Sequence, residues 1–472
     1  MPTTNQYNVT KQRKRNIYVK INLLNFNFQI VDELSGVVLS DTWTISSSSD
    51  IRRTGTITLT PTDSSFEIEA GNKIWLDKYI QPFIGIENIH TGEVEYTNMG
   101  IYLIDNPSQN FSSTDNTITI QLIDLMSKIT GLRNGNLEGY EYQIKEGTSI
   151  REAIIGILKE CGFNKYIIDI KSEDYQTVQY DISVSVGGTY YQLLTELNNM
   201  NVNYQIYFDV DGVFHYEKIP DGVNEQVIID DNIWKRCYIS HTVNTSFEDL
   251  KNSITVLGKM HDISNYCSSI SLSGSQINAT CSNVSALRNN LKVGFTTPDN
   301  TINSPSFNLN SYGAKLIKNE NGTQPILEPN TYYVIKYKQD GDYWFFMGEL
   351  QPMYIVEETN PNSPFYVNGT TGRIRIVLSG GEYDNINTTD LARQRAEWEL
   401  YTRCRLLDSI TLTCVPIYWA DVNTLIEITL PNKTESQKYI IKEISITGGI
   451  SGTQSIQMMK YYPYYETNRL FQ

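Results

Sequence analysis

Short segments in which apolar and polar residues alternate constrain the fold of this chain more than any other feature. Such an alternation occurs in residues 16–30, 54–60, 100–105 and 117–122. Successive side chains of a β-strand point to opposite faces, so a period of two predicts strands with one buried face. The apolar positions of the first two segments are Ile17, Val19, Ile21, Leu23, Ile57 and Leu59. We therefore expect residues 1–135 to form an all-β domain that ends in a short helical turn.

The hydrophobic period changes to that of a helix between residues 136 and 235. Ser149 and Glu152 have the capping-box spacing, in which both side chains satisfy free N–H groups at a helix start. Apolar residues then recur at helical spacing until Gly162, which is typical of a helix end. A second helix is predicted to begin at Thr189, followed by a hairpin around the Asp-Gly turn at Gly212. We assign residues 136–235 to a small α+β domain.

Two separated segments, 236–259 and 372–472, again show strand patterns, and we assign them to a second β-domain. A helix at 391–406 interrupts the second segment. Its apolar stripe is Ala392, Ala396, Leu400 and Cys404, and the pairs Arg395–Glu399 and Glu399–Arg403 are expected to stabilise its exposed side.

The residues between these segments, 260–371, are richer in Ser, Asn and Gly. They contain a predicted hairpin, 332–337 with 343–347, around Asp340 and Gly341. We interpret them as an inserted β-module. The predicted fold class is thus mainly β with α+β parts, in several domains.

Composition and charge limit the function classes. The 472 residues are 40% hydrophobic, so a large core needs no disulfides, and only 19% are charged. A net charge of −15 argues against binding along nucleic acid, since phosphate contacts need Lys and Arg. The charge serves either general solubility or a carboxylate-lined pore that repels DNA. There is no apolar signal core and no membrane-spanning run, so we expect synthesis in the cytoplasm and no secretion by signal peptide.

The cysteines and the basic tract have mainly structural interpretations. Six cysteines without a CxxC pair predict buried free thiols, although Cys267 and Cys281 could pair. Residues 11–15, KQRKR, are read as a solvated arm before a strand, and alternatively as an arm that docks on an acidic neighbouring subunit.

No motif of catalysis, metal binding or phosphate binding is convincing. The four histidines lack metal-ligand spacing, and His215 is expected to be a satisfied, half-buried imidazole. Asp209–Gly212 resembles the start of a calcium loop, but Val213 and Pro220 stand where ligands are needed. The glycines before Thr189 are weak support for a phosphate site. We expect no enzyme activity, no cofactor and no metal.

The aromatic hairpin offers one candidate binding site. Tyr343, Trp344 and Phe345 could stack on sugar rings, while the alternative is that they form the core of a small β-domain.

Several segments, taken in order, resemble the baseplate hub proteins of phages and phage-like particles of Gram-positive bacteria. They are TYYQLLTELNNMNVNYQIYFDVDGVFHYEKI (189–219), NSITVLG (252–258) and LARQRAEWELYTRCRLLDSITL (391–412), with 421–430 and 438–446 after them. Residues 307–317 and 330–337 are similar to a module that recurs in phage tail proteins.

This resemblance implies two tail-tube-like β-barrel domains per subunit and a homotrimer with six barrels around a channel for DNA ejection. The implied role is a structural hub in the virion baseplate, made in the host cytoplasm. It would close the tail tube and anchor the distal tail protein, the tape measure protein and other baseplate or spike proteins. DNA would pass without specific binding. The alternative function is a carbohydrate-binding tail adhesin. Many relatives carry a wall hydrolase after the hub, but only residues 461–472 follow the last strand pattern, so we expect no fused lysin.

Overall fold

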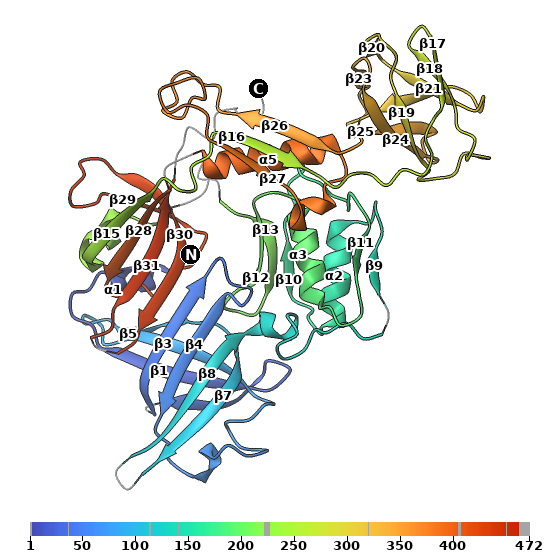
Figure 1. The fold of residues 1–472 in the computed structure, drawn as a ribbon. Coiled ribbons are helices and arrows are strands. Elements are labelled where there is room, and N and C mark those ends of the chain that lie inside the picture. The colour runs from blue at the N-terminus through green and yellow to red at the C-terminus, as the bar shows by residue number, and fades with distance from the viewer. Residues whose placement is uncertain are drawn as a thin grey trace. The chain divides into compact units, whose positions relative to one another are not determined.

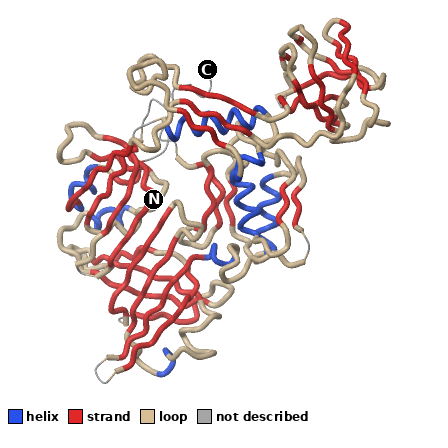
Figure 2. Tube along the Cα trace, in the orientation of Figure 1, coloured by secondary structure: helices blue, strands red, loops and turns tan. Residues whose placement is uncertain are grey.

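The computed structural model describes residues 2–35, 37–112, 115–139, 141–220, 227–319, 321–404, 407–449 and 451–461. These residues are mostly β-structure in several sheets, as Figure 2 shows. The chain divides into two compact units, Met1–Ser246 with Leu407–Gln472, and Phe247–Leu406. The second unit is an insertion between β15 (Tyr238–Ser246) and β28 (Leu407–Cys414), which pair with each other antiparallel.

One sheet of 14 strands organises the first unit (Figure 1). Its main path is β15-β28-β31-β30-β3-β4-β8-β7-β5-β1-β2, with β6, β14 and β29 attached beside it. The strands of its N-terminal half are β1 (Ile17–Leu24), β2 (Ile30–Ser35), β3 (Val38–Ser46), β4 (Arg53–Leu59), β5 (Tyr79–Glu87), β6 (Val94–Asn98), β7 (Tyr102–Phe111) and β8 (Asn116–Asp124). The predicted helical turn is the 3₁₀ helix η2 (Leu125–Lys128), and a second, η1, spans Ser64–Phe66.

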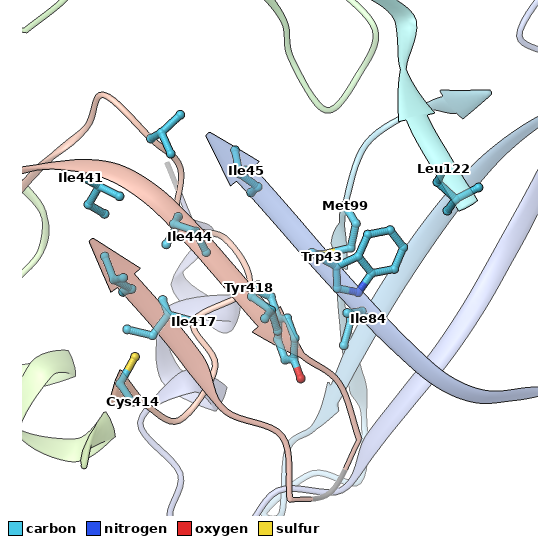
Figure 3. Close-up of a cluster of buried hydrophobic side chains, with 14 of the residues drawn as sticks. Trp43, Ile45, Ile84, Met99, Leu122, Cys414, Ile417, Tyr418, Ile441 and Ile444 are labelled. Atoms are coloured by element: carbon cyan, nitrogen blue, oxygen red, sulfur yellow. The ribbon is translucent and has the colours of Figure 1, made fainter. Parts of the chain in front are cut away.

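The C-terminal half of the unit continues the same sheet. Its elements are β14 (Val227–Ile229), α4 (Asp231–Cys237), β15, β28, β29 (Leu425–Ile428), β30 (Gln437–Thr447) and β31 (Gln454–Lys460). The two halves join where β3 pairs with β30, for example Ile45 opposite Ile444. Figure 3 shows Trp43 and Ile45 beside Ile444 and Tyr418 in the hydrophobic core that both halves share.

Most of the residues predicted as the α+β domain, 136–235, surround a second hydrophobic core in the same unit, whereas β14 and α4 belong to the core of the 14-stranded sheet. The helices around this second core are α2 (Ile150–Glu160) and α3 (Tyr190–Asn199), and the strands are β9 (Tyr142–Ile144), β10 (Tyr166–Ile168), β11 (Ile182–Val184), β12 (Tyr204–Phe208) and β13 (Phe214–Lys218). Thr189 and Gln192 form a complete capping box at α3. At α2 the Ser149 hydroxyl accepts from the Glu152 N–H, and Gly162 adopts φ +81° just past the helix end. The change of the hydrophobic period from that of a strand to that of a helix therefore predicted both helices correctly.

The second unit contains the inserted β-module and a smaller helix-covered sheet. The module has seven strands in the order β17-β18-β21-β22-β25-β24-β19, and its predicted hairpin is β24 with β25. The bounds are β17 (Ser269–Ser273), β18 (Gln276–Thr280), β19 (Lys292–Thr296), β20 (Ile302–Asn303), β21 (Ser306–Leu309), β22 (Lys315–Lys318), β23 (Ile326–Leu327), β24 (Tyr332–Lys338) and β25 (Tyr343–Glu349). The smaller sheet has β16 (Ser253–Leu257) between β26 (Met353–Glu357) and β27 (Arg375–Leu378), with η3 (Gly381–Asn385) and α5 (Thr389–Arg403) after it.

This smaller sheet differs from the expected bounds of the second β-domain and of the inserted module, since β26 was assigned to the module (260–371) but pairs with β16. Residues 247–259 and 372–404, assigned to the second β-domain from sequence, lie in the second unit, and β16 pairs with no strand of the 14-stranded sheet. The physical reason is that Ile254 and Val256 pack against Ala392 and Ala396 of α5. A strand and a helix that bury each other leave no apolar face for the larger sheet. The expected helix end at Leu406 lies outside the described residues.

The stripe predicted for α5 is buried, but the predicted ion pairs are not on an exposed side. Glu399 is only 4% exposed, and Arg395 Nε and Arg403 Nε lie 2.9 and 2.7 Å from its carboxylate. The Tyr383 hydroxyl also donates to Glu399, at 3.1 Å. These pairs therefore belong to the packing of the smaller sheet.

Candidate functional site

The non-core face of the 14-stranded sheet carries an unusual series of hydroxyl groups. Directly opposite residues of paired strands share a face, so the pairings define rows that cross the sheet. We call these rows the hydroxyl face. The first row is Ser240, Thr413, Ser455, Ser445, Thr44 and Thr54, on six successive strands. The next rows are Thr447, Thr42, Thr56 and Gln121, and then Ser40, Thr58, Thr119 and Ser108.

The hydroxyl face bears little charge. Thr58 and Thr119 hydroxyls lie 3.2 Å apart, which is the distance of a hydrogen bond along the row. Asp105, opposite Gln121, ends the second row at β7 and pairs with Arg133 at 3.2 Å. Glu443 lies opposite Ser46 beside the first row. A lining of many carboxylates, which the net charge had suggested as one possibility, is not found in these rows.

The packing on the opposite face of the same strands determines which side chains face the core. Trp43 lies opposite Ile446 and Gly55, and all three side-chain positions face the core. A Cβ at residue 55 would lie 2.6 Å from the Trp43 ring, so glycine makes room for the indole. A shift of register by one residue would expose this core face and bury the hydroxyls.

Several strand edges of the sheet are open among the described strands, and two of them, β15 and the distal part of β7, lie at the ends of the strands that carry the hydroxyl face. β15 is the first strand of the sheet path and pairs only with β28. β7 contacts β5 only through Tyr102 and Leu103, so its distal part has a partner on one side. Ile239 and Val243 on β15 are 50% and 45% exposed, and Phe111 on β7 is 77% exposed. Open edges with exposed apolar residues are ready to pair with another chain.

A buried charge junction connects β4, β12 and the loop before β29. The Arg53 guanidinium is 2% exposed and forms an ion pair with Asp421. Arg52 donates to Gln205 Oε1 at 3.2 Å and to the Val422 carbonyl at 3.0 Å. The junction therefore holds the α+β domain against both halves of the sheet.

His215 is satisfied and half-buried, as its strand pattern predicts. Its Nε2 lies 3.1 Å from Asp209 Oδ2 and its Nδ1 lies 3.2 Å from Glu217 Oε2. Its ring stacks on Tyr207 with centroids 4.9 Å apart. Burial lowers the pKa of His215, but hydrogen bonds to the two carboxylates and their charges raise it overall, to about 9. The imidazolium therefore serves the packing of this hairpin.

The three predicted sugar-stacking residues lie on two different faces of the module's sheet. Trp344 is fully buried, with Phe307 and Tyr337 against its ring, so it is part of the module's core. Tyr343 and Phe345 point to the other face of the sheet and are half-buried. Their rings lie under the ammonium groups of three lysines.

The other candidates have structural roles. Within the described ranges no group of three His, Cys, Asp or Glu side chains could hold a metal ion. The Asp209 carboxylate accepts from the Asp211 and Val213 N–H groups and so closes a turn. The Thr189 hydroxyl caps α3, so it is engaged with its own helix. None of the helices in the described part combines the length and apolar character that a membrane crossing requires.

The prediction for the cysteines is confirmed, and the prediction for the basic tract is only partly correct. A helix missed from sequence, α1 (Thr4–Thr10), precedes the tract. Arg13 and Lys14 are exposed, but Arg15 Nη1 donates to the Pro416 carbonyl at 2.5 Å, so the tract is not wholly a solvated arm. All six cysteines are buried free thiols. Cys267 interacts with Cys281, and burial raises the pKa of Cys267 to about 12.

The fold is that of known tail proteins. The structure matches the 43 kDa tail protein of prophage MuSo2 from Shewanella oneidensis with a TM-score of 0.50 and 11% identity, over 93% of this chain and 98% of that one. It matches the tail protein from Neisseria meningitidis MC58 with a TM-score of 0.52 and 10% identity, over 95% and 98%. A family described as "Domain of unknown function (DUF5048)" matches residues 362–465. No curated protein matches.

The hydroxyl face was not anticipated, although its signal is present in the sequence. The segments 42–46, 56–60 and 117–120 alternate large apolar residues with Ser or Thr rather than with mixed polar residues. The strands were predicted from the apolar positions alone.

Proposed function

We propose that this chain is a structural subunit of a phage tail or phage-like injection machine, and that it acts as a baseplate hub. The observation that carries the proposal is the continuous eight-stranded path β15-β28-β31-β30-β3-β4-β8-β7, which has one apolar face and one hydroxyl face. The likeness in fold to two tail proteins supports it. The role is non-catalytic, and the place of action is the tail tip of the virion.

In this proposal three copies close into a ring, with the open edge of β15 in one copy meeting the distal part of β7 in the next. Ring closure would satisfy backbone groups at both edges and cover Ile239, Val243 and Phe111. The contact joins two different edges, so the interface is heterologous and closes by rotation. The distal tail, tape measure and spike proteins are the expected neighbours of such a ring.

The hydroxyl face would line the channel of the ring. Neutral hydroxyl and amide groups offer DNA no lysine or arginine to bind its phosphates, so the polyanion can slide without being held. These groups also remain hydrated, because each hydroxyl can both donate a hydrogen bond to water and accept one from it. The lining would therefore be non-adhesive rather than repulsive.

Assembly is tested by measuring the mass of the purified protein by light scattering. We expect three times 53.9 kDa for the wild type. Val243→Lys places a charge in the proposed interface and should shift the mass toward one copy. The control is Val377→Lys, at a 53% exposed position of β27, which should leave the mass unchanged. A wild type that stays monomeric at high concentration contradicts ring assembly.

The channel is tested separately with particles. Thr44→Lys with Thr56→Lys puts two cations on the hydroxyl face, and we expect particles that assemble normally but release DNA more slowly. Asn164→Lys, at an exposed site of the α+β domain, is the matched control. Normal DNA release by the double variant would mean that this face does not line the path.

A further inference from the structure

The residues that lead into the inserted module lie between two strands of its sheet. We call residues 265–268 the entry segment. The Cys267 N–H donates to the carbonyl of Gly294, on β19, at 2.9 Å. The Ser268 N–H donates to the carbonyl of Thr280, on β18, at 3.0 Å. Since β18 and β19 lie near opposite ends of the sheet order, the entry segment connects the two ends of this sheet.

A β-bulge places Cys267 opposite Cys281. Ser269 is paired with Thr280, and the Ser268 N–H reaches the same Thr280, so two residues of one strand lie against one residue of the other. The extra residue shifts the alternation of side chains by one position. Cys267 therefore follows as the residue opposite Cys281, and both side chains belong to the core of the module, each with 1% exposure.

The two cysteines form a non-hydrogen-bonded pair, in which opposite residues of antiparallel strands come closest. The Cys267 N–H is directed away from its partner, to Gly294, and the Cys281 N–H donates to Asn310 Oδ1 at 2.8 Å. The Cα atoms of such a pair are about 4.5 Å apart, within the span of about 4.4 to 6.8 Å that a disulfide bridges. Burial, and next the charge and hydrogen bond of Cys281, raise the pKa of Cys267 to about 12. The two thiols are therefore in contact.

Cys237 and Cys414 show that burial in one core does not by itself make such a pair. Both are fully buried in the core of the 14-stranded sheet. The Cys237 thiol, however, donates to the Thr10 carbonyl at 3.7 Å, and the Cys414 thiol donates to Gln454 Oε1 at 3.7 Å. Each of these thiols thus has an oxygen acceptor of its own.

We propose that Cys267 and Cys281 are a site of disulfide formation, which fastens the entry segment to β18 once the protein leaves a reducing compartment. The oxidant is a small-molecule disulfide. One cysteine loses its proton and attacks this disulfide, forming a mixed disulfide and releasing one small thiol. The second cysteine then attacks the mixed disulfide, so that the Sγ–Sγ bond forms and the other small thiol leaves with the second proton. The bond concerns the module alone and does not depend on the proposed hub function.

The attack requires the entry segment to open, because both sulfur atoms are buried. Tyr266 and Ser268, on either side of Cys267, are exposed, so the segment lies at the surface. Opening breaks the hydrogen bonds of the entry segment to Gly294, including the one from the Gly294 N–H to the Asn265 carbonyl at 3.0 Å. Local opening of a surface segment costs less than global unfolding, so we expect a slow reaction that goes to completion in the folded protein.

Peptide mapping of the full chain tests the bond. The reduced protein is incubated with oxidised glutathione, its remaining thiols are alkylated in denaturant, and it is cleaved with trypsin without reduction. Residues 260–287 contain no lysine or arginine, so cleavage after Lys259 and Arg288 releases both cysteines in one peptide. We expect this peptide to be unlabelled and lighter by two hydrogen atoms than its reduced form. Cys237 and Cys414 should be labelled as free thiols.

The bond should form without disturbing the module. The near-ultraviolet circular dichroism, to which the buried Trp344 contributes, should be unchanged. Hydrogen exchange in residues 264–268 should slow by about tenfold or more on oxidation, because the crosslink restricts local opening. Cys281→Ser should abolish this slowing, whereas Cys161→Ser, which removes a buried thiol of the first unit, should retain it.

Three results overturn the proposal. The oxidation is repeated in urea just below the unfolding midpoint, where the entry segment opens readily, so that slow access cannot conceal the bond. Complete labelling of Cys267 and Cys281 under this condition, or a stable glutathione adduct on either, shows that the two sulfur atoms do not reach each other. A bond that forms only with loss of the circular dichroism signal is incompatible with the folded module.

Discussion

Replacing Asp421 with alanine should destabilise the first unit strongly, because it leaves the Arg53 guanidinium buried without its counter-charge. Arg53 is 2% exposed, and its Nε has no hydrogen-bond partner in the structure. Removing one partner of a buried ion pair costs about 3–5 kcal/mol, since the remaining charge has lost water without compensation. For a unit of this size the midpoint of thermal unfolding should fall by on the order of 6–10 °C.

The decisive comparison is the double variant Arg53→Met with Asp421→Ala. Methionine fills much of the space of the arginine stem without a charge, so the double variant should regain most of the stability that the single variant loses. Arg52 would keep its contacts to Gln205 and the Val422 carbonyl. The guanidinium of Arg52 also lies 3.9 Å from the Tyr207 ring centroid, a contact that the double variant leaves in place.

Hydrogen exchange followed by mass spectrometry is the suitable assay, since the chain has two units and one unfolding transition cannot be assumed. Peptides of β4 and β30 should lose protection in Asp421→Ala and recover it in the double variant. The control is Asp169→Ala, which removes a surface ion pair with Lys171 and should cost less than about 1 kcal/mol. If Asp421→Ala behaves like this control, or if the double variant is no better than the single, the buried-charge argument is refuted.

Three further predictions concern other buried groups. The pKa of His215 is raised to about 9, so its contribution to the free energy of unfolding is complete below pH 6.5 and is lost as the pH rises through 9. This contribution is about 3 kcal/mol at most. In His215→Gln the fall of thermal stability between these pH values should therefore be flatter than in the wild type. Gly55→Val should overpack the Trp43 ring and cost about 1–3 kcal/mol, measured by urea unfolding of the first unit; an unchanged urea midpoint would contradict the packing argument. Glu399→Ala removes the acceptor of two arginines and should cost about 2–3 kcal/mol, seen as faster hydrogen exchange in α5 and β16; unchanged exchange in both would show that the pairs are dispensable.

Local patterns in the sequence were enough to locate most elements. The period of two placed the strands around Ile57 and Ile120, and the caps at Ser149 and Thr189 placed α2 and α3. These features depend on residues close together in the chain, so the interactions that determine them lie within a short stretch of sequence. The mainly β, multidomain character followed from them.

What the sequence determined by itself was therefore the strands, the helices and the alternation of apolar with hydroxyl residues. The tertiary structure decided which strands adjoin: β3 pairs with β30, although Thr44 and Ser445 are 401 positions apart, and only this pairing makes their hydroxyls one row. It also decided that β16 packs on α5 and that Trp344 is buried while Phe345 is not. Alternation fixes that two neighbouring side chains face opposite ways, but which face becomes the core depends on the partner that covers it.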